Sequence, residues 1–198
     1  LAYNLVSEVT AATERLYAQN SNFEHLIVDC GFPLASEELP DDIQKAKEQN
    51  TDALIALSYK YNCDYLKIDN KGVSQNYNAV IEYLQPDETD ILIAVDPDEI
   101  TNESKWVNAL CEVLRADETM GYAVPMVTGA DKILTNNPAA VLETIAGHRV
   151  YIMFGQLNYG FLAIHGRFLK LIKQVPVPHT MQIYGGLEAE LFRLARHH

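Results

Sequence analysis

The run Ile91-Leu92-Ile93-Ala94-Val95-Asp96-Pro97-Asp98-Glu99 decides which fold we expect for this chain. It opens with five apolar residues in succession and continues with three carboxylates within four residues, interrupted by Pro97. A short apolar run bounded by turn residues is typical of a strand buried on both faces, as the strands of a parallel sheet are. We therefore expect a buried strand over residues 91–95 and a turn directly after it.

Two earlier segments have the same character as this run. Residues 25–29 and 65–69 are short apolar segments, and each ends on an aspartate. Apolar residues recur at helical spacing beside them, and the expected helices cover residues 5–16, 54–61, 77–84 and 106–114. This alternation over the first 116 residues predicts an α/β fold, with a Rossmann-like, mostly parallel sheet that carries helices on both faces.

The rest of the chain follows a weaker pattern. We expect strands over residues 122–127 and 159–164 and a last helix over residues 187–194, whereas residues 129–155 show no clear period. A chain of 198 residues, 48 % hydrophobic and 21 % charged, has the length and composition of one globular domain. The sequence therefore predicts a single domain over residues 1–198.

Charge and composition exclude several classes of function. The net charge of −12 opposes binding of nucleic acid, and an acidic protein that handles a diphosphate needs a divalent cation. Cys30, Cys63 and Cys111 are odd in number and form no CxxC pair, so we expect buried free thiols rather than disulfides or a zinc site. No apolar run approaches the roughly 18–20 residues that span a bilayer. The expected location is the cytoplasm, with peripheral attachment to a membrane left open.

Polar residues follow the expected strands at the edge where parallel sheets bind their ligands. These residues are Asn4, Asp29, Asp69, Asn70 and the Asp96–Glu99 turn. Three crowded carboxylates destabilise a fold unless a cation or hydrogen-bond donors compensate their charge, and carboxylate oxygens suit Mg²⁺ or Mn²⁺. The alternative is an acidic turn that caps a helix starting near Thr101.

Four segments, in order along most of the chain, resemble those of the family 2 glycosyltransferases, which belong to the nucleotide-diphospho-sugar transferase superfamily and have the GT-A fold. The segments are Leu1–Asn4, similar to the end of the first strand; Ile27–Asp29, similar to the second; Lys71–Asn78, similar to a GVSxxxN segment; and Asp96–Asp98, at the DxD-like position. Tyr77 stands where the family commonly has an arginine. A fifth segment, Gly185–Glu190, is similar to the region that supplies the catalytic base.

The resemblance implies a role for individual residues. The donor-binding residues would be Asn4, Asp29, Asn70, Gly72, Asn78 and Asp96, and the metal ligands would be Asp98, Asp96 and His179. Either Glu188 or Glu190 would be the catalytic base. Residues 1–116 would form the nucleotide-sugar-binding half of the domain and residues 117–198 the acceptor-side half.

The function implied by the resemblance is a metal-dependent, inverting transfer of a sugar. The donor would be a nucleotide-diphosphate sugar, with UDP-sugars favoured, and the acceptor a saccharide or a lipid-linked molecule. A nucleotidyltransferase is one alternative, although residues 1–7 lack the glycine and the basic residue of its phosphate-binding loop. The other alternative is a non-catalytic module that binds a nucleotide sugar without turnover.

Overall fold

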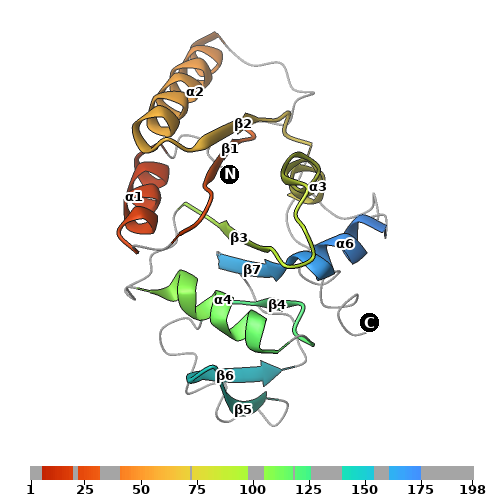
Figure 1. Ribbon diagram of the computed structural model, residues 1–198. Coiled ribbons are helices and arrows are strands. Elements are labelled where there is room, and N and C mark those ends of the chain that lie inside the picture. Colours follow the sequence, from red (N-terminus) through yellow and green to blue (C-terminus); the bar gives the residue numbers. More distant parts are fainter. Residues whose placement is uncertain are drawn as a thin grey trace. The chain divides into compact units, whose positions relative to one another are not determined.

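The chain divides into two compact units, each with its own sheet (Figure 1). The first unit contains the described residues up to Gln85 together with Asp96 and Pro97, and the second contains Pro86–Val95 and the described residues from Lys105 onward. The computed structural model describes residues 6–19, 22–31, 41–71, 73–97, 105–117, 119–125, 140–153 and 161–174.

The first unit is built around a pair of parallel strands. Its described elements are α1 (Val6–Tyr17), β1 (Leu26–Asp29), α2 (Asp41–Tyr61), β2 (Asp64–Lys67) and α3 (Val73–Leu84). β1 and β2 pair from Leu26 opposite Asp64 to Asp29 opposite Lys67. Parallel neighbours need a crossover connection, and α2 supplies it, packed beside both strands.

Apolar contact holds α2 against β1. Leu54 and Leu57 of α2 are buried with Ile27 of β1. Residues three, four or seven apart lie on the same face of a helix, so the face that buries Leu54 also carries Thr51 and Lys47. Because α2 returns the chain to the start of β2, these two residues lie toward the carboxyl end of β1.

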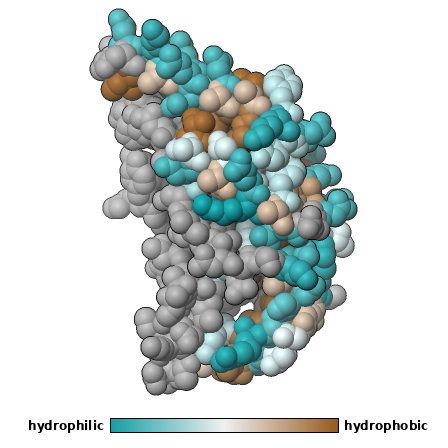
Figure 2. Space-filling view, turned by 90° about the vertical axis from the view of Figure 1, so that its left-hand side faces the viewer, coloured by the Kyte–Doolittle hydropathy of each residue, from teal (hydrophilic) through white to brown (hydrophobic). Residues whose placement is uncertain are grey.

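The opposite face of α2 is polar. Gln44 donates a hydrogen bond to Glu48 at 3.0 Å, and Tyr59 is 81 % exposed. Figure 2 shows the side on which α1 and α2 lie, and its upper part is mostly hydrophilic with small hydrophobic areas. The helix is therefore fixed by one apolar stripe in its second half, while its first half carries polar residues.

The second unit has an antiparallel sheet and a separate hairpin. Its described elements are β3 (Ile91–Val95), α4 (Trp106–Ala116), β4 (Tyr122–Ala123), β5 (Ala140–Ile145), β6 (His148–Met153), β7 (Phe161–His165) and α6 (Gly166–Gln174). The strand order is β3-β7-β4, with β7 antiparallel to both neighbours, and β5 and β6 form the hairpin. The central strand β7 buries Leu162, Ala163 and Ile164 in succession, since both of its faces are covered.

The prediction of a Rossmann-like, mostly parallel sheet of the GT-A type is wrong. Among the described residues, β1 and β2 make a short parallel sheet of two strands, and the other sheets are antiparallel. The decisive run Ile91–Val95 is a strand, as predicted, but its partner is β7. An apolar run has the same pattern in a central antiparallel strand as in a parallel one. The run therefore does not show which strand pairs with it or whether the pairing is parallel.

Several element boundaries also differ from expectation. The helix expected over residues 54–61 begins at Asp41, and the strand expected over residues 122–127 is short, at Tyr122–Ala123. The hairpin Ala140–Met153 lies largely in the segment to which no period was assigned. The last expected helix, residues 187–194, lies outside the described residues. The single-domain division at residue 116 stays a prediction.

Two expectations about composition can be compared with the structure. The three cysteines are free, with Cys30 buried and Cys63 and Cys111 half-buried. None of the helices in the described part of the chain has the length and apolar content needed to cross a membrane. The free thiols agree with the sequence-based prediction.

We predict that Leu54→Ala lowers the free energy of unfolding by about 2–5 kcal/mol, because it leaves a cavity at a fully buried position between α2 and β1. Tyr59→Ala, on the exposed face of the same helix, should change it by about 0.5 kcal/mol or less. Urea unfolding followed by circular dichroism measures both. Similar losses in the two variants would contradict the packing described for α2.

Candidate functional site

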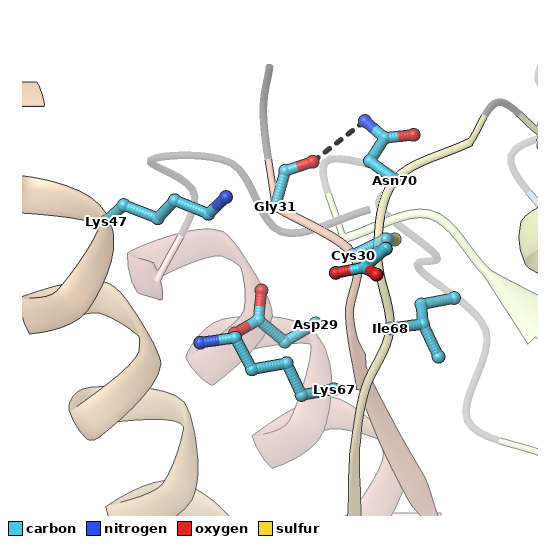
Figure 3. A pocket seen from close by; sticks show the side chains of 8 residues that line it. Asp29, Cys30, Gly31, Lys47, Lys67, Ile68 and Asn70 are labelled. Atoms are coloured by element: carbon cyan, nitrogen blue, oxygen red, sulfur yellow. Dashed lines mark hydrogen bonds between the residues drawn. The ribbon is translucent and has the colours of Figure 1, made fainter. Parts of the chain in front are cut away.

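A pocket opens where β1 and β2 end (Figure 3). It is lined by Asp29, Cys30, Gly31, Lys47, Lys67, Ile68, Asp69 and Asn70. Its volume of about 120 Å³ is close to that of cavities that accept a single six-membered ring, roughly 150 Å³. The pocket therefore has room for one ring of a ligand, and larger parts would extend outside it.

Asp29, the last residue of β1, is the buried charge of this pocket. Its side chain is 4 % exposed, and Oδ2 accepts hydrogen bonds from Thr51 Oγ1 and Tyr65 Oη, each at 2.8 Å. Burial of a carboxylate is costly unless donors compensate it, and these two donors do so. Among the described residues no hydrogen bond goes to Oδ1, which lies 3.9 Å from where a Cβ on Gly31 would stand. Within the described part of the chain, the carboxylate is thus anchored through Oδ2, and Oδ1 lies on the side of Gly31, which lines the pocket.

Burial keeps the neutral groups of the site protonated. Burial, with the hydrogen bond to Asp29, raises the pKa of the Tyr65 phenol, so Tyr65 remains a hydrogen-bond donor at neutral pH. Burial also raises the pKa of the Cys30 thiol. A protonated thiol is a poor nucleophile, so burial disfavours reaction at Cys30, which lines the pocket.

Two lysines approach the pocket from different elements. Lys47 reaches from α2 over Gly31, and its Cε lies 2.9 Å from the position that a Cβ on Gly31 would occupy. Lys67, at the end of β2, donates from Nζ to Thr51 Oγ1 at 3.3 Å. With Asp29 and Asp69, the charged lining sums to zero, in a chain of net charge −12. An anionic ligand is therefore less strongly repelled here than over most of the surface.

A line of amide hydrogen bonds joins the loops that follow the two strands. Asn70 Nδ2 donates to the carbonyl of Gly31 at 2.8 Å, the bond drawn in Figure 3. Asn76 Nδ2 of α3 donates to Asn70 Oδ1 at 3.1 Å, and the amide of Lys71 donates to Asn76 Oδ1 at 3.2 Å. Asn76 is 4 % exposed. One side of the pocket is thus braced from α3.

The structure brings together two of the donor-binding residues expected from the sequence, Asp29 and Asn70. Asn78 is exposed on α3, and Asp96 is exposed directly after β3. Neither residue lines the pocket. The remaining expected site residues lie outside the described residues and stay predictions: Asn4, Gly72, Asp98, His179, Glu188 and Glu190.

Five residues of the site were not expected from the sequence: Thr51, Tyr65, Lys47, Lys67 and Asn76. The spacing of Lys47, Thr51 and Leu54 at i, i+4 and i+7 was a usable signal, because it places the three on one helix face. Nothing in the local sequence distinguishes Asn76 from Asn78, two positions later. Only the direction in which α3 presents each side chain separates them.

Of the expected metal ligands, Asp98 and His179 lie outside the described residues, so the expected metal site stays a prediction. No group of three or more His, Cys, Asp or Glu side chains that could hold a metal ion occurs in the described part of the chain, and Asp96 is exposed. Mg²⁺ and Mn²⁺ require several oxygen ligands in a defined geometry. We therefore derive no step that passes through a metal ion.

We predict that Gly31→Ala and Gly147→Ala each lower the free energy of unfolding by about 1–2 kcal/mol, because both glycines have a left-handed φ, +56° and +83°. Gly31→Ala must also displace Lys47, whereas a Cβ on Gly147 has no atom within 4 Å. Acetylation of Lys47, followed by mass spectrometry, should therefore be faster in Gly31→Ala alone. Equal rates in both variants would contradict the position of Lys47 over Gly31.

We predict that part of the stability is lost in alkali through Tyr65. Its pKa is raised in the folded state above the value of about 10 in the unfolded chain, so the stability is present below about pH 10 and falls as the pH rises through the folded pKa. Tyr65→Phe should remove this dependence and lower stability at pH 7 by about 1.5–3 kcal/mol, the contribution of a hydrogen bond to a charged group. Urea unfolding between about pH 7 and pH 11 tests both, with exposed Tyr59→Phe as control. Parallel curves for the native chain and Tyr65→Phe would disprove it.

No protein-family model matches this chain, and none of the curated proteins matches it. The likeness to family 2 glycosyltransferases therefore consists of the motifs quoted above. Of the residues in those motifs, Asp29 lies in the pocket, beside the strand-end residue Asn70. The geometry of this pocket is the basis on which a function can be proposed.

Proposed function

We propose that this chain is a glycosyltransferase whose pocket binds the nucleoside part of a nucleotide-diphosphate sugar, with UDP-sugars favoured. The acceptor would be a saccharide or a lipid-linked molecule. One observation carries the proposal: a buried carboxylate at the end of a parallel strand is anchored through Oδ2 and keeps Oδ1 toward a pocket flanked by two lysines.

Asp29 suits a ligand that donates hydrogen bonds. The hydroxyls of ribose and the ring N–H of uracil or guanine are such donors, and a carboxylate accepts from them more strongly than a neutral group does. Thr51 and Tyr65 already hold the carboxylate, so a ligand need not order it. The pocket is also about as large as one ring.

Lys47 and Lys67 suit the anionic part of the same ligand. A lysine ammonium binds phosphate oxygens as a point charge on a flexible stem, which accommodates a diphosphate that extends beyond the pocket. Positive charge beside the leaving diphosphate would also stabilise the transition state of transfer. Donor recognition at Asp29 and anion binding at the lysines therefore favour a nucleotide over a neutral sugar.

The proposed reaction is a direct displacement. The bond between the anomeric carbon and the diphosphate oxygen breaks, and its electron pair leaves with the nucleoside diphosphate. The acceptor oxygen bonds to the opposite face of the same carbon, and its proton passes to a carboxylate base. Glu188 and Glu190 are the candidates for that base, on the strength of the resemblance, and they lie outside the described residues.

A module that binds a nucleotide sugar without turnover is the second candidate. It is favoured by the lining of the pocket, where Thr51 and Tyr65 hold the Asp29 carboxylate and burial raises the pKa of the Cys30 thiol. The two candidates share the ligand and differ in whether the donor is consumed. Release of UDP from UDP-glucose, UDP-galactose or UDP-N-acetylglucosamine, with candidate acceptors added, separates them.

We predict that UDP binds to the native chain and that Asp29→Asn weakens its binding about 10- to 100-fold, which corresponds to about 1.5–3 kcal/mol for a charged hydrogen bond. Asp64→Asn is the matched control, because it removes the same charge from an exposed residue at the opposite end of the two-stranded sheet. Isothermal titration calorimetry with UDP and GDP, in EDTA and in Mn²⁺, gives the dissociation constants and the metal requirement separately. Absence of UDP binding, or equal weakening by both substitutions, would contradict the assignment of the pocket.

A further inference from the structure

The hydrogen bonds that run from α3 to the pocket, here called the amide line, can have only one order of donors and acceptors. At one end the backbone N–H of Lys71 can only donate, so it fixes Oδ1 of Asn76 as an acceptor. Asn76 must then present Nδ2 to Asn70, and Asn70 must present Nδ2 to the carbonyl of Gly31, which can only accept. Both side-chain amides are therefore oriented by backbone groups at the two ends, and each hydrogen bond polarises the next.

This line begins where the pairing of the strands ends. The last hydrogen bond between the two strand segments runs from the amide of Ile68 to the carbonyl of Asp29, at 3.0 Å. Beyond it, the bond from Asn70 to Gly31 ties the two loops together. Gly31 is held in a left-handed conformation, and the hydrogen bond from Asn70 fixes the direction of its carbonyl.

We propose that Asn76 is a positioning residue for the pocket, acting through Asn70 to fix the carbonyl of Gly31 and with it the wall beside Asp29. The effect on nucleotide affinity rests on the function proposed above. Asn76 is buried and does not line the pocket, whereas Asn70 and Gly31 do, so Asn76 acts without touching a ligand. Gln75, the exposed residue directly before Asn76 on α3, serves as the control.

The first test reads the amide line without any ligand. In ¹⁵N-labelled native protein, the side-chain amide of Asn70, assigned by its loss in Asn70→Asp, should exchange slowly with solvent. Asn76→Ala should speed this exchange at least tenfold and shift the backbone amide signals next to Gly31, whereas Gln75→Ala should leave both unchanged. Unchanged Asn70 signals in Asn76→Ala would overturn the proposal, whether or not the protein binds UDP. If Asn76→Ala does not fold, the nearly isosteric Asn76→Asp makes the same comparison, since an ionised carboxylate cannot donate to Asn70.

The second test is a double-mutant cycle on UDP affinity. Asn76→Ala and Asn70→Ala should each raise the dissociation constant about tenfold, the effect of losing one hydrogen bond. If Asn76 acts through Asn70, the double variant should be no weaker than Asn70→Ala alone, and Gln75→Ala should lie within twofold of native. Additive losses in the double variant, or native affinity in Asn76→Ala, would overturn the positioning role. If native protein does not bind UDP, the proposed function fails, and the amide exchange decides the positioning role on its own.

Discussion

Burial of the Asp29 carboxylate is the constraint on which the first unit depends. A buried charge stabilises nothing unless donors reach it, and here the donors come from α2 and from β2. Those two elements can deliver Thr51 and Tyr65 only if α2 stays seated on β1, which the packing of Leu54 on Ile27 ensures. The apolar core and the polar pocket therefore require each other. A substitution that disturbs the packing of Leu54 on Ile27 would therefore also disturb the hydrogen bonds to Asp29, and the reverse.

In the second unit, the junction of β7 and α6 is held by backbone contacts rather than by a buried charge. Gly166 joins the central strand β7 to α6, and a Cβ there would overlap the carbonyl oxygen of Asp87. The amide of Gly166 donates to the carbonyl of Asp90, and that of Arg167 to the carbonyl of Glu88. The first two N–H groups of α6 thus reach main-chain carbonyls, and that of Arg167 also donates to Nδ1 of His165 at 3.3 Å.

The strands β1, β2 and β3 and the helix α4 were predictable from local patterns, because each depends on its own apolar residues. The partner of β3 was not, since β7 follows some 70 residues later and nothing in Ile91–Val95 encodes it. The first half of α2 was missed because polar residues there leave no apolar stripe. For the same reason Lys47 was missed, while Asp29 and Asn70 were found because the ends of strands β1 and β2 could be located. Asp29 and Asn70 could therefore be predicted as site residues from their positions at strand ends. The residues that hydrogen-bond to them, Thr51, Tyr65 and Asn76, could not.

The pocket is also local along the chain. Every described residue that lines or braces it lies between Asp29 and Asn76, and its hydrogen bonds to Asp29 and Gly31 join residues 22, 36 and 39 positions apart. Loop-closure entropy rises with sequence separation, so separations of this size favour fast formation of these contacts over longer-range ones. During synthesis the strands, the crossover helix and the bracing asparagine are all present once the chain reaches Leu84. The described residues that line and brace the binding site thus come from one continuous stretch of the chain, and none of them belongs to the antiparallel sheet.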